Sequence, residues 1–276
     1  MTLAPDPLAD TVERACAGDA AAVEELVCAV QDRIYGLALR MLWHPEDARD
    51  ATQDILVKIV THLSSYRGES RFSSWCFAIA ANHLRTVRRG RVEQMDYTFE
   101  TFEAELHEPS GTDQPMRDHP EYRLAVEEVR VGCTLGMLLC LNRDLRLAYI
   151  LGEILELDHN EAAEILDTTP AAYRQRLARA RNAIVEFTSR VCGIVNRENA
   201  CRCENRTSFA VRSGRVTLGS PVFGDVLRET APRHDEIKAE IARLDEMRRA
   251  VALYRTHPTF AAPSDLRDVI AGFLAR

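Results

Sequence analysis

The stretch that decides the fold is residues 157–185, LDHNEAAEILDTTPAAYRQRLARARNAIV. Its apolar residues recur at helical spacing in two blocks, which the polar residues 167–169 separate. Asp158 can cap the first helix, and Pro170 suits the first position of the second helix, where its missing N–H costs nothing. The second helix carries Arg174, Arg176, Arg179 and Arg181. The pattern predicts a helix-turn-helix unit that reads the major groove of DNA; the alternative is an amphipathic helix with a solvated arginine face.

The composition favours a helical protein of more than one domain. With 276 residues, 46% of them hydrophobic, and only 13 glycines and 11 prolines, the chain has room for two or three small helical domains. The net charge of −7 argues weakly against nucleic-acid binding, but the charge is segregated. Residues 71–91 hold five arginines and no acid, whereas residues 93–118 hold eight acids and one arginine. This distribution indicates basic DNA-facing modules and an acidic tether.

The N-terminus lacks the pattern of a signal peptide, and no apolar run approaches the roughly 18 residues that span a bilayer. We therefore expect a cytoplasmic protein with no membrane partner. Its eight cysteines are then expected to be thiols or metal ligands rather than structural disulfides.

The chain divides into four predicted segments. Residues 8–91 read as one helical domain, residues 92–119 as an acidic linker, and residues 120–190 as a second helical domain that ends in the helix-turn-helix. Residues 191–276 form a cysteine-containing extension, with a hairpin predicted at 208–218 and helices at 235–254 and 264–274. The predicted fold class is mainly α, with an α+β or helical extension.

Two ordered blocks of residues resemble one known family. Residues 46–58 read EDARDATQDILVK, residues 66–75 read YRGESRFSSW and residues 79–82 read IAAN, while the second block, residues 174–181, reads RQRLARAR. This order resembles the extracytoplasmic-function (ECF) sigma factors of the sigma-70 superfamily, which keep only regions two and four. The chain departs from the family pattern at Leu56 and at Ala171, Ala172 and Tyr173. The promoter sequence is therefore not transferable from a relative.

The resemblance implies a sigma factor without catalytic activity that binds core RNA polymerase and directs promoter recognition and transcription initiation. Its second domain would rest on the flap of one large polymerase subunit, and its first on the clamp helices of the largest subunit. The residues implied in this clamp docking are Asp47, Asp50, Gln53, Asp54 and Lys58.

The resemblance also implies two DNA-binding surfaces. In the family, the loop that corresponds to residues 66–74 captures a flipped base of the minus-ten element. Such a pocket is needed because unstacking a base costs free energy. Capture would fall to Arg67, Ser70, Phe72 and Ser74, and backbone contacts to Asn82, Arg85, Arg88 and Arg89. The upstream element would be read by Thr169, Ala171, Ala172, Arg174, Gln175, Arg176 and Arg179. We interpret Trp75 as a core residue, because apolar side chains flank it.

The acidic linker has two readings. It is either a solvated tether or, as the resemblance implies, a negative strand that occupies a nucleic-acid channel near the polymerase active centre and is displaced by growing RNA.

The extension contains three thiols in twelve residues, Cys192, Cys201 and Cys203. They are candidate ligands for zinc or another thiophilic metal, although C-x8-C-x-C is neither a ribbon nor a finger spacing. A fourth ligand could be His234 or His257. Redox-responsive thiols and plain structural cysteines are the alternatives. No cofactor is required by the predicted function.

The last two predicted helices have apolar stripes and need a partner to be stable. We therefore hypothesise that the extension regulates the sigma domains, in place of or beside a separate anti-sigma factor. The competing function is a one-component metal- or redox-sensing regulator that binds DNA alone. An enzyme is disfavoured, because the extension shows no nucleotide loop, catalytic triad or H-E-x-x-H motif.

Overall fold

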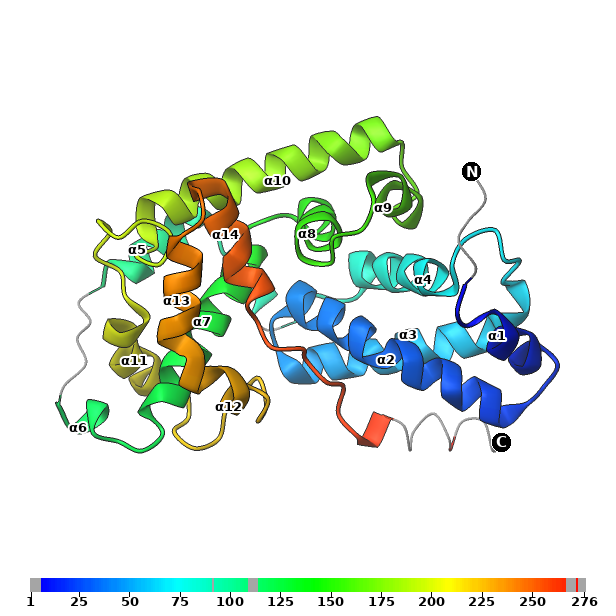
Figure 1. Cartoon of the computed structure of the whole chain (residues 1–276), viewed down its shortest axis with the longest axis horizontal. Coiled ribbons are helices and arrows are strands. Elements are labelled where there is room, and N and C mark those ends of the chain that lie inside the picture. The colour runs from blue at the N-terminus through cyan, green and yellow to red at the C-terminus, as the bar shows by residue number, and fades with distance from the viewer. Residues whose placement is uncertain (1–5, 91, 109–113, 267–271, 273–276) are drawn as a thin grey trace. The chain divides into compact units, whose positions relative to one another are not determined.

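The computed structural model describes residues 6–90, 92–108, 114–266 and 272 (Figure 1). The chain forms two compact units. Unit 1 consists of Met1–Val92, Leu157–Arg174 and Phe260–Arg276, and unit 2 of Glu93–Glu156 and Gln175–Thr259. The described residues form helices and a single isolated bridge between Cys192 and Cys201, with no extended strand. The predicted mainly helical fold is confirmed.

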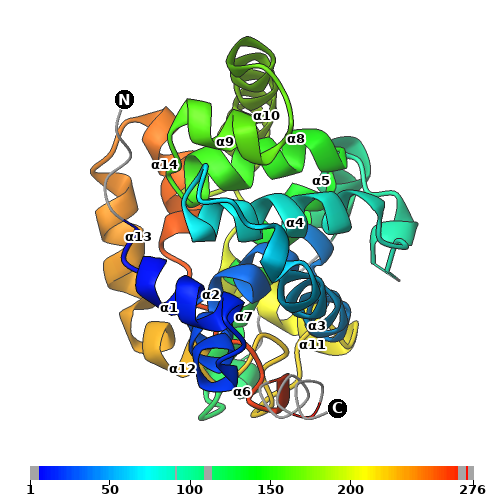
Figure 2. The ribbon, with the colours of Figure 1, turned by 90° about the vertical axis from the view of Figure 1, so that its right-hand side faces the viewer.

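Unit 1 is built on a helical hairpin. Its helices are α1 (Ala9–Cys16), α2 (Ala20–Leu42), α3 (Pro45–Thr61), η1 (Leu63–Ser65), α4 (Phe72–Thr86), α9 (His159–Ile165) and the first turn of α10 (Pro170–Val191). The Asp19 carboxylate caps α2 by accepting the N–H groups of Ala21 and Ala22, and Pro45 opens α3. Helix α4 packs on both α2 and α3 (Figure 2). Helix α4 also packs on α9, whereas the outer face of α3 exposes Asp50 and Asp54.

Unit 2 is organised around α7 (Tyr122–Leu139), most of whose side chains are buried. Its other helices are η2 (Glu93–Met95), α5 (Phe99–Leu106), α6 (Gln114–Arg117), α8 (Arg143–Tyr149), the π-helical turn η3 (Ile150–Ile154), the rest of α10, α11 (Cys203–Arg212), α12 (Leu227–Thr230), η4 (Ala231–Arg233), α13 (His234–Ala242) and α14 (Glu246–Arg255). Helices α11, α12 and α14 pack directly on α7. The extension therefore completes the core of unit 2.

The predicted hairpin at residues 208–218 is wrong. Helix α11 runs through Arg212, and Gly214, with φ of 71°, ends it in a left-handed turn in which the Arg215 N–H donates to the Ala210 carbonyl. A serine-glycine pair suits a helix end as well as a hairpin turn, since only the positive φ is required. Ala210 and Val216 then pack on Ala125 of α7, which burial favours over an isolated hairpin.

The predicted helix at residues 235–254 is two helices. Asp245 caps α14 by accepting the Arg248 N–H at 3.0 Å, so the chain turns between α13 and α14. Most of the helix predicted at 264–274 lies outside the described residues.

The segment predicted as an acidic linker contains helix α5. Thr98 and Thr101 form a capping box at its start, and Phe102 is buried with its ring centroid 5.9 Å from that of Phe187. The aromatic residues of this segment thus give it a packed place in unit 2.

Candidate functional site

Helix α3 presents an acidic outer face. Ala51, Ile55 and Ile59 are buried, which turns the side chains of Asp50 and Asp54 outward with 74% and 66% of their areas exposed. The other predicted docking residues lie on the same helix: Asp47 and Gln53 are half-buried, and Lys58 is exposed. A Cβ on Gly90 would come within 1.9 Å of Asp47 Oδ2, so a larger residue at this position would require the Asp47 carboxylate to move.

Lys58 is linked to the interior of unit 1. Its Nζ lies 2.7 Å from Nδ1 of His83, and His83 Nε2 lies 3.8 Å from Asp54 Oδ2. Burial of the ring, and then the charge of Lys58, lower the pKa of His83. The neutral ring can therefore accept a hydrogen bond from the Lys58 ammonium group. Lys58 and Asp54 are therefore positioned by α4.

The loop before α4 is held by aromatic packing. The Tyr66 hydroxyl donates to the Ser70 carbonyl at 2.7 Å, and the ring centroids of Tyr66, Phe72 and Trp75 lie 5.5–5.7 Å apart. Arg67 is exposed and Ser70 half-buried. Phe72 is completely buried, so the expectation that its ring touches a base does not fit this structure. Its packing supports the loop instead.

Trp75 is half-buried and lines a hollow of about 430 Å³ beside this loop. The hollow is also lined by Arg67, Ser70 and Ser74 of the predicted capture set. The interpretation of Trp75 as a core residue, which rested on its apolar neighbours, is therefore only partly correct.

The basic end of α4 lines a second hollow, of about 540 Å³. Asn82 is exposed there and accepts a hydrogen bond from Arg85 Nη1 at 3.3 Å. Arg88 and Arg89 are exposed just after the helix. The predicted backbone-contacting residues are thus gathered at one end of α4.

Helix α9 engages two of the predicted DNA-binding groups of α4. The Ser74 hydroxyl donates to Glu161 at 2.5 Å, and Arg85 Nη2 donates to the carbonyl of Leu166 at 3.4 Å. Glu164 and Ile165 also line the hollow beside Trp75. An acidic helix therefore occupies part of this surface in unit 1.

The start of α10 buries its apolar residues on one face, as the helical spacing of the sequence predicts. Thr169 accepts the Ala172 N–H at 3.2 Å, and Tyr173, Leu177 and Ile184 are buried on the inner face. The outer positions are exposed at Thr169, Ala171, Arg174, Gln175 and Arg179 and half-buried at Ala172 and Arg176. Arg181 instead donates to Glu153 at 2.8 Å and has a structural role.

The cysteine cluster gains a member from α7. Cys192 and Cys201 pair through their backbones, with Gly193 N–H donating to the Cys201 carbonyl at 3.2 Å, and Cys203 opens α11. Burial raises the pKa of Cys133 well above its usual value, and the nearby Cys201, Cys203 and Cys192 raise it further. Sequence spacing gave no signal for Cys133, which lies far away along the chain.

The histidines considered as a fourth ligand have other partners. His234 Nδ1 lies 3.1 Å from Glu127 Oε2, and His257 Nε2 lies 2.7 Å from the hydroxyl of Thr134. Within the described ranges, no group of three or more His, Cys, Asp or Glu side chains is placed to hold a metal ion.

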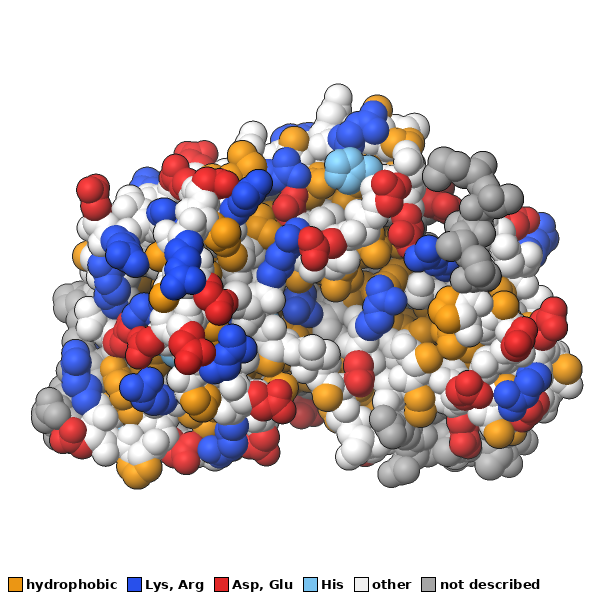
Figure 3. Space-filling model, viewed as in Figure 1, with side chains coloured by type: hydrophobic (Ala, Val, Ile, Leu, Met, Phe, Trp, Pro, Cys, Tyr) orange, Lys and Arg blue, Asp and Glu red, His pale blue; other side chains and the backbone are white. Residues whose placement is uncertain are grey.

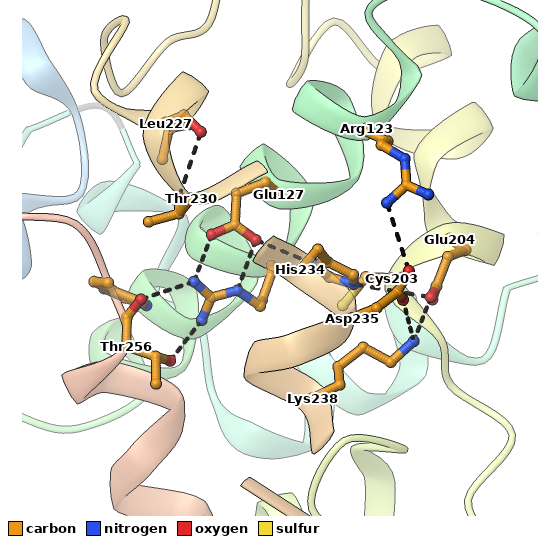
Figure 4. Close-up of polar contacts among 12 residues, drawn as sticks. Arg123, Glu127, Cys203, Glu204, Leu227, Thr230, His234, Asp235, Lys238 and Thr256 are labelled. Carbon is orange, nitrogen blue, oxygen red and sulfur yellow. Dashed lines mark hydrogen bonds and ion pairs between the residues drawn. The ribbon is translucent and has the colours of Figure 1, made fainter. Parts of the chain in front are cut away.

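A buried ion pair within α7 holds the arginine that fastens the extension to this helix (Figure 4). Arg130 donates from Nε and Nη2 to Glu127 at 2.9 and 2.6 Å, and both residues are at most 1% exposed. The same guanidinium donates to the Leu253 carbonyl and to the hydroxyl and carbonyl of Thr256, at 3.1–3.2 Å. The charge is thus fully paired, as a buried cation requires.

On the face drawn in Figure 3, basic and acidic side chains are interspersed over α13 and α14. Surface pairs such as Lys238–Glu204, at 2.5 Å, account for part of this mixture. That face of the extension resembles a solvated protein surface more than a nucleic-acid site.

Among the described residues, no helix is long and apolar enough to cross a membrane.

Comparisons with known proteins identify the family. The family model for sigma-70 region 2 matches residues 26–92, and that for sigma-70 region 4 matches residues 132–184. The chain is 33% identical over 180 residues to the RNA polymerase sigma-H factor of Pseudomonas aeruginosa, covering 63% of this chain and 89% of that protein. It is 33% identical over 175 residues to the ECF RNA polymerase sigma-E factor of Escherichia coli strain K12, covering 63% of this chain and 90% of that protein. The chain therefore belongs to the ECF-type sigma factors of the sigma-70 family.

Proposed function

We propose that this sigma factor binds core RNA polymerase through the acidic face of α3 and directs initiation at promoters. The observation that carries the proposal is the order of the two matched regions, each of which contains a predicted contact surface. Region 2 supplies the docking residues on α3 and the basic end of α4, and region 4 supplies the start of α10. The protein acts in the cytoplasm, where polymerase and promoters are found, and we assign it no catalytic activity.

The docking assignment rests on charge and exposure. Asp50 and Asp54 are a turn apart on α3, are well exposed and lie on one face with Gln53 and Lys58, while Asp47 begins the same row. Exposed carboxylates are inexpensive to present and steer association with a basic partner surface. A partner with complementary basic residues on the polymerase clamp fits this face.

The minus-ten assignment rests on the hollow beside Trp75. Arg67, Ser70 and Ser74 offer donors and an acceptor to a base edge, and Trp75 offers a ring face for stacking. Phe72 positions the loop from within. Asn82, Arg85, Arg88 and Arg89 then follow the DNA backbone. Because Glu161 and Leu166 bind Ser74 and Arg85 in unit 1, α9 must leave this surface before promoter DNA can occupy it.

Run-off transcription with purified core polymerase, with and without the protein, tests the function. We expect promoter-dependent transcripts only with the protein. The variant Asp50→Lys/Asp54→Lys should weaken core binding at least about tenfold while preserving helicity, and Glu13→Lys on exposed α1 is the matched control. Unchanged assembly of the double variant in a pull-down would reject the docking face.

The same experiment separates the competing function. A one-component regulator would bind its DNA tightly without polymerase and would leave the core unbound. The acidic α3 face has no role in such a regulator, which is why we favour the sigma factor. A separate anti-sigma factor is compatible with the proposal, and its natural targets are these same surfaces.

For the extension we propose zinc, or another thiophilic metal, as a ligand of Cys192, Cys201 and Cys203. The support is that they are half-buried and lie close to one another and to Cys133, which gives four thiols in one region. The side chains would have to draw together to coordinate an ion. Metal content of the purified protein, compared with Cys201→Ser/Cys203→Ser, tests this; equal, substoichiometric metal in both would reject it and favour a thiol or structural role.

A further inference from the structure

We propose that residues 260–266 of the C-terminal extension, here called the strap, are part of the polymerase-docking surface of region 2, where Asp265 neutralises the charge of Arg49 on α3. The partner is a basic protein surface, as for the acidic face of α3. The inference rests on the proposed function and adds to it a segment outside the two matched sigma regions. The strap, helices α2 and α3 and the docking residues all lie within unit 1.

The first residues of the strap are anchored on α2. Phe260 is 2% exposed, and its ring centroid lies 5.0 Å from the Cζ of Arg40. The Ala262 N–H donates to Asp32 Oδ1 at 2.9 Å. Burial lowers the pKa of Arg40 to about 10, and an aromatic face stabilises a guanidinium that has lost its water. The strap therefore contributes to the packing around α2.

The exposed residues of the strap lie between two buried ones. Leu266, at the far end from Phe260, is completely buried, and its N–H donates to the Pro263 carbonyl at 3.1 Å. Ser264 and Asp265 lie between these ends and are exposed. Because burial of an apolar side chain at each end stabilises the bound position of the strap, Asp265 is presented to solvent from an ordered segment.

Asp265 forms an ion pair with α3 beside the docking residues. Its Oδ2 accepts from Nε and Nη2 of Arg49 at 3.2 and 2.5 Å. The third nitrogen, Nη1 of Arg49, lies 3.4 Å from Asp50 Oδ1. Hydrogen bonding to Arg49 holds the pKa of Asp265 below its usual value, so this carboxylate is ionised. One guanidinium thus lies between the carboxylate of the strap and that of a docking residue.

Arg49 is a cation among acids on the docking helix. Its neighbours along α3 are Glu46, Asp47 and Asp50. A basic partner surface attracts these carboxylates and repels an uncompensated cation beside them, which weakens the complex. Asp265 offsets the Arg49 charge, and its side chain, 52% exposed, adds to the negative potential of this face. The strap therefore makes the face more complementary to a basic partner.

The first test changes the charge of the strap in the full-length protein and measures its affinity for purified core polymerase. Asp265→Lys should weaken binding at least about tenfold and Asp265→Ala about three- to fivefold, because Arg49 is then uncompensated. Both losses should shrink as ionic strength rises. Glu13→Lys makes the same change of charge as Asp265→Lys on exposed α1, and as the control it should bind within about twofold of the wild type.

A double variant separates charge compensation from simple loosening of the strap. Arg49→Ala/Asp265→Ala should bind core polymerase within about twofold of the wild type, because no cation is left to repel the partner. Removing Arg49 cannot restore a strap that has only come loose. If the double variant binds as weakly as Asp265→Ala, or if Asp265→Ala binds like the wild type, compensation of Arg49 by Asp265 is wrong.

A third variant tests the anchor on α2. Phe260→Ala should speed hydrogen exchange in the turn of α2 that contains Arg40 and should weaken core binding about as much as Asp265→Ala, since a detached strap no longer holds its carboxylate on Arg49. Ser264→Ala, at an exposed strap position, should change neither measurement. Unchanged exchange in Phe260→Ala, or faster exchange with unchanged core binding, would overturn the place of the strap in the docking surface.

Failure of this inference is distinguishable from failure of the proposed function. The variant Asp50→Lys/Asp54→Lys is measured in the same binding assay. If it binds weakly while the Asp265 and Phe260 variants bind like the wild type, the docking face stands and the strap is not part of it. If the wild type binds no core, or if Asp50→Lys/Asp54→Lys binds as well as the wild type, the proposed docking function fails instead.

Discussion

The interior around α7 and the outer face of α10 use arginine in opposite ways. Arg146, 2% exposed, donates to the carbonyls of Leu138, Leu139 and Leu141 and to Glu93, and Arg130 is as completely satisfied. The side chains of Arg174 and Arg176 on α10 make no hydrogen bond or ion pair with any residue that the structure describes. The same side chain thus stabilises the fold where carbonyls and carboxylates reach it, and where none does it is left for the DNA contact that we propose.

The largest effect on stability is expected from replacing one of the buried arginines. Arg130→Met leaves Glu127 buried without its cation and frees the end of α14, so we expect a loss of about 3–5 kcal/mol in the free energy of unfolding. Denaturant unfolding monitored by circular dichroism measures it. Arg123→Ala, which removes an exposed pair with Asp235, should change the same quantity by at most about 1 kcal/mol.

A second variant tests whether the lost stability comes from leaving the Glu127 carboxylate without its cation. Replacing both partners, in Glu127→Gln/Arg130→Met, should recover much of the lost stability, because the uncompensated carboxylate is gone. If Arg130→Met unfolds at the same denaturant concentration as the wild type, the buried pair is not what fastens the extension to α7.

The next effect is expected from replacing the arginines on the outer face of α10. Arg176→Ala should relax discrimination at one position of the upstream promoter element by about 1–3 kcal/mol, if it reads a base, without altering thermal stability. Alanine at the more exposed Arg174 should weaken binding to all sequences alike, as expected of a phosphate contact. Transcription from a promoter-variant library with core polymerase measures both. Identical profiles for both variants and the wild type would remove α10 as the reader.

The last prediction concerns Glu128, a buried acid on α7, and the dependence of stability on pH. Glu128, next to Glu127, is 1% exposed, and burial raises its pKa to about 7, while the Val222 N–H donates to it. Its folded pKa lies above the unfolded value of 4.5, so its contribution to stability is full below pH 4.5 and is lost as pH rises through 7.

Glu128→Gln retains an acceptor for Val222 and carries no charge. We expect it to match the wild type near pH 4.5 and to be more stable by up to about 3 kcal/mol at pH 8, which is the shift of Glu128 converted at about 1.4 kcal/mol per pKa unit. Unfolding measured at a series of pH values checks this. A difference that does not change with pH would show that Glu128 keeps its charge throughout, or stays neutral throughout.

Much of the fold could be predicted because it rests on local patterns. Apolar spacing, Asp158 as a cap and Pro170 at a helix start are each visible over a few residues, and each is found in the structure. Predictions failed where one local signal serves two structures. Ser213 and Gly214 suit a hairpin and a helix end equally, and only the packing of Val216 on α7 decided between them.

The candidate site divides in the same way. Exposure of Asp50, Asp54 and Arg174 followed from helical periodicity, because their burial depends on which face of their own helix they occupy. The burial of Phe72 and the partial exposure of Trp75 depend on the packing of three aromatic rings around the start of α4, which no spacing encodes.

The sequence by itself determined that this is a helical sigma factor, since two motif blocks in order and the periodicity of their helices are properties of the chain. Only the tertiary structure decided what the extension does to that scaffold. Arg130 meets the end of α14 across more than a hundred residues, Cys133 joins a distant cysteine cluster, and Asp265 meets Arg49. Such pairings depend on how the chain returns on itself, and burial and charge compensation at those meetings are invisible to local sequence pattern.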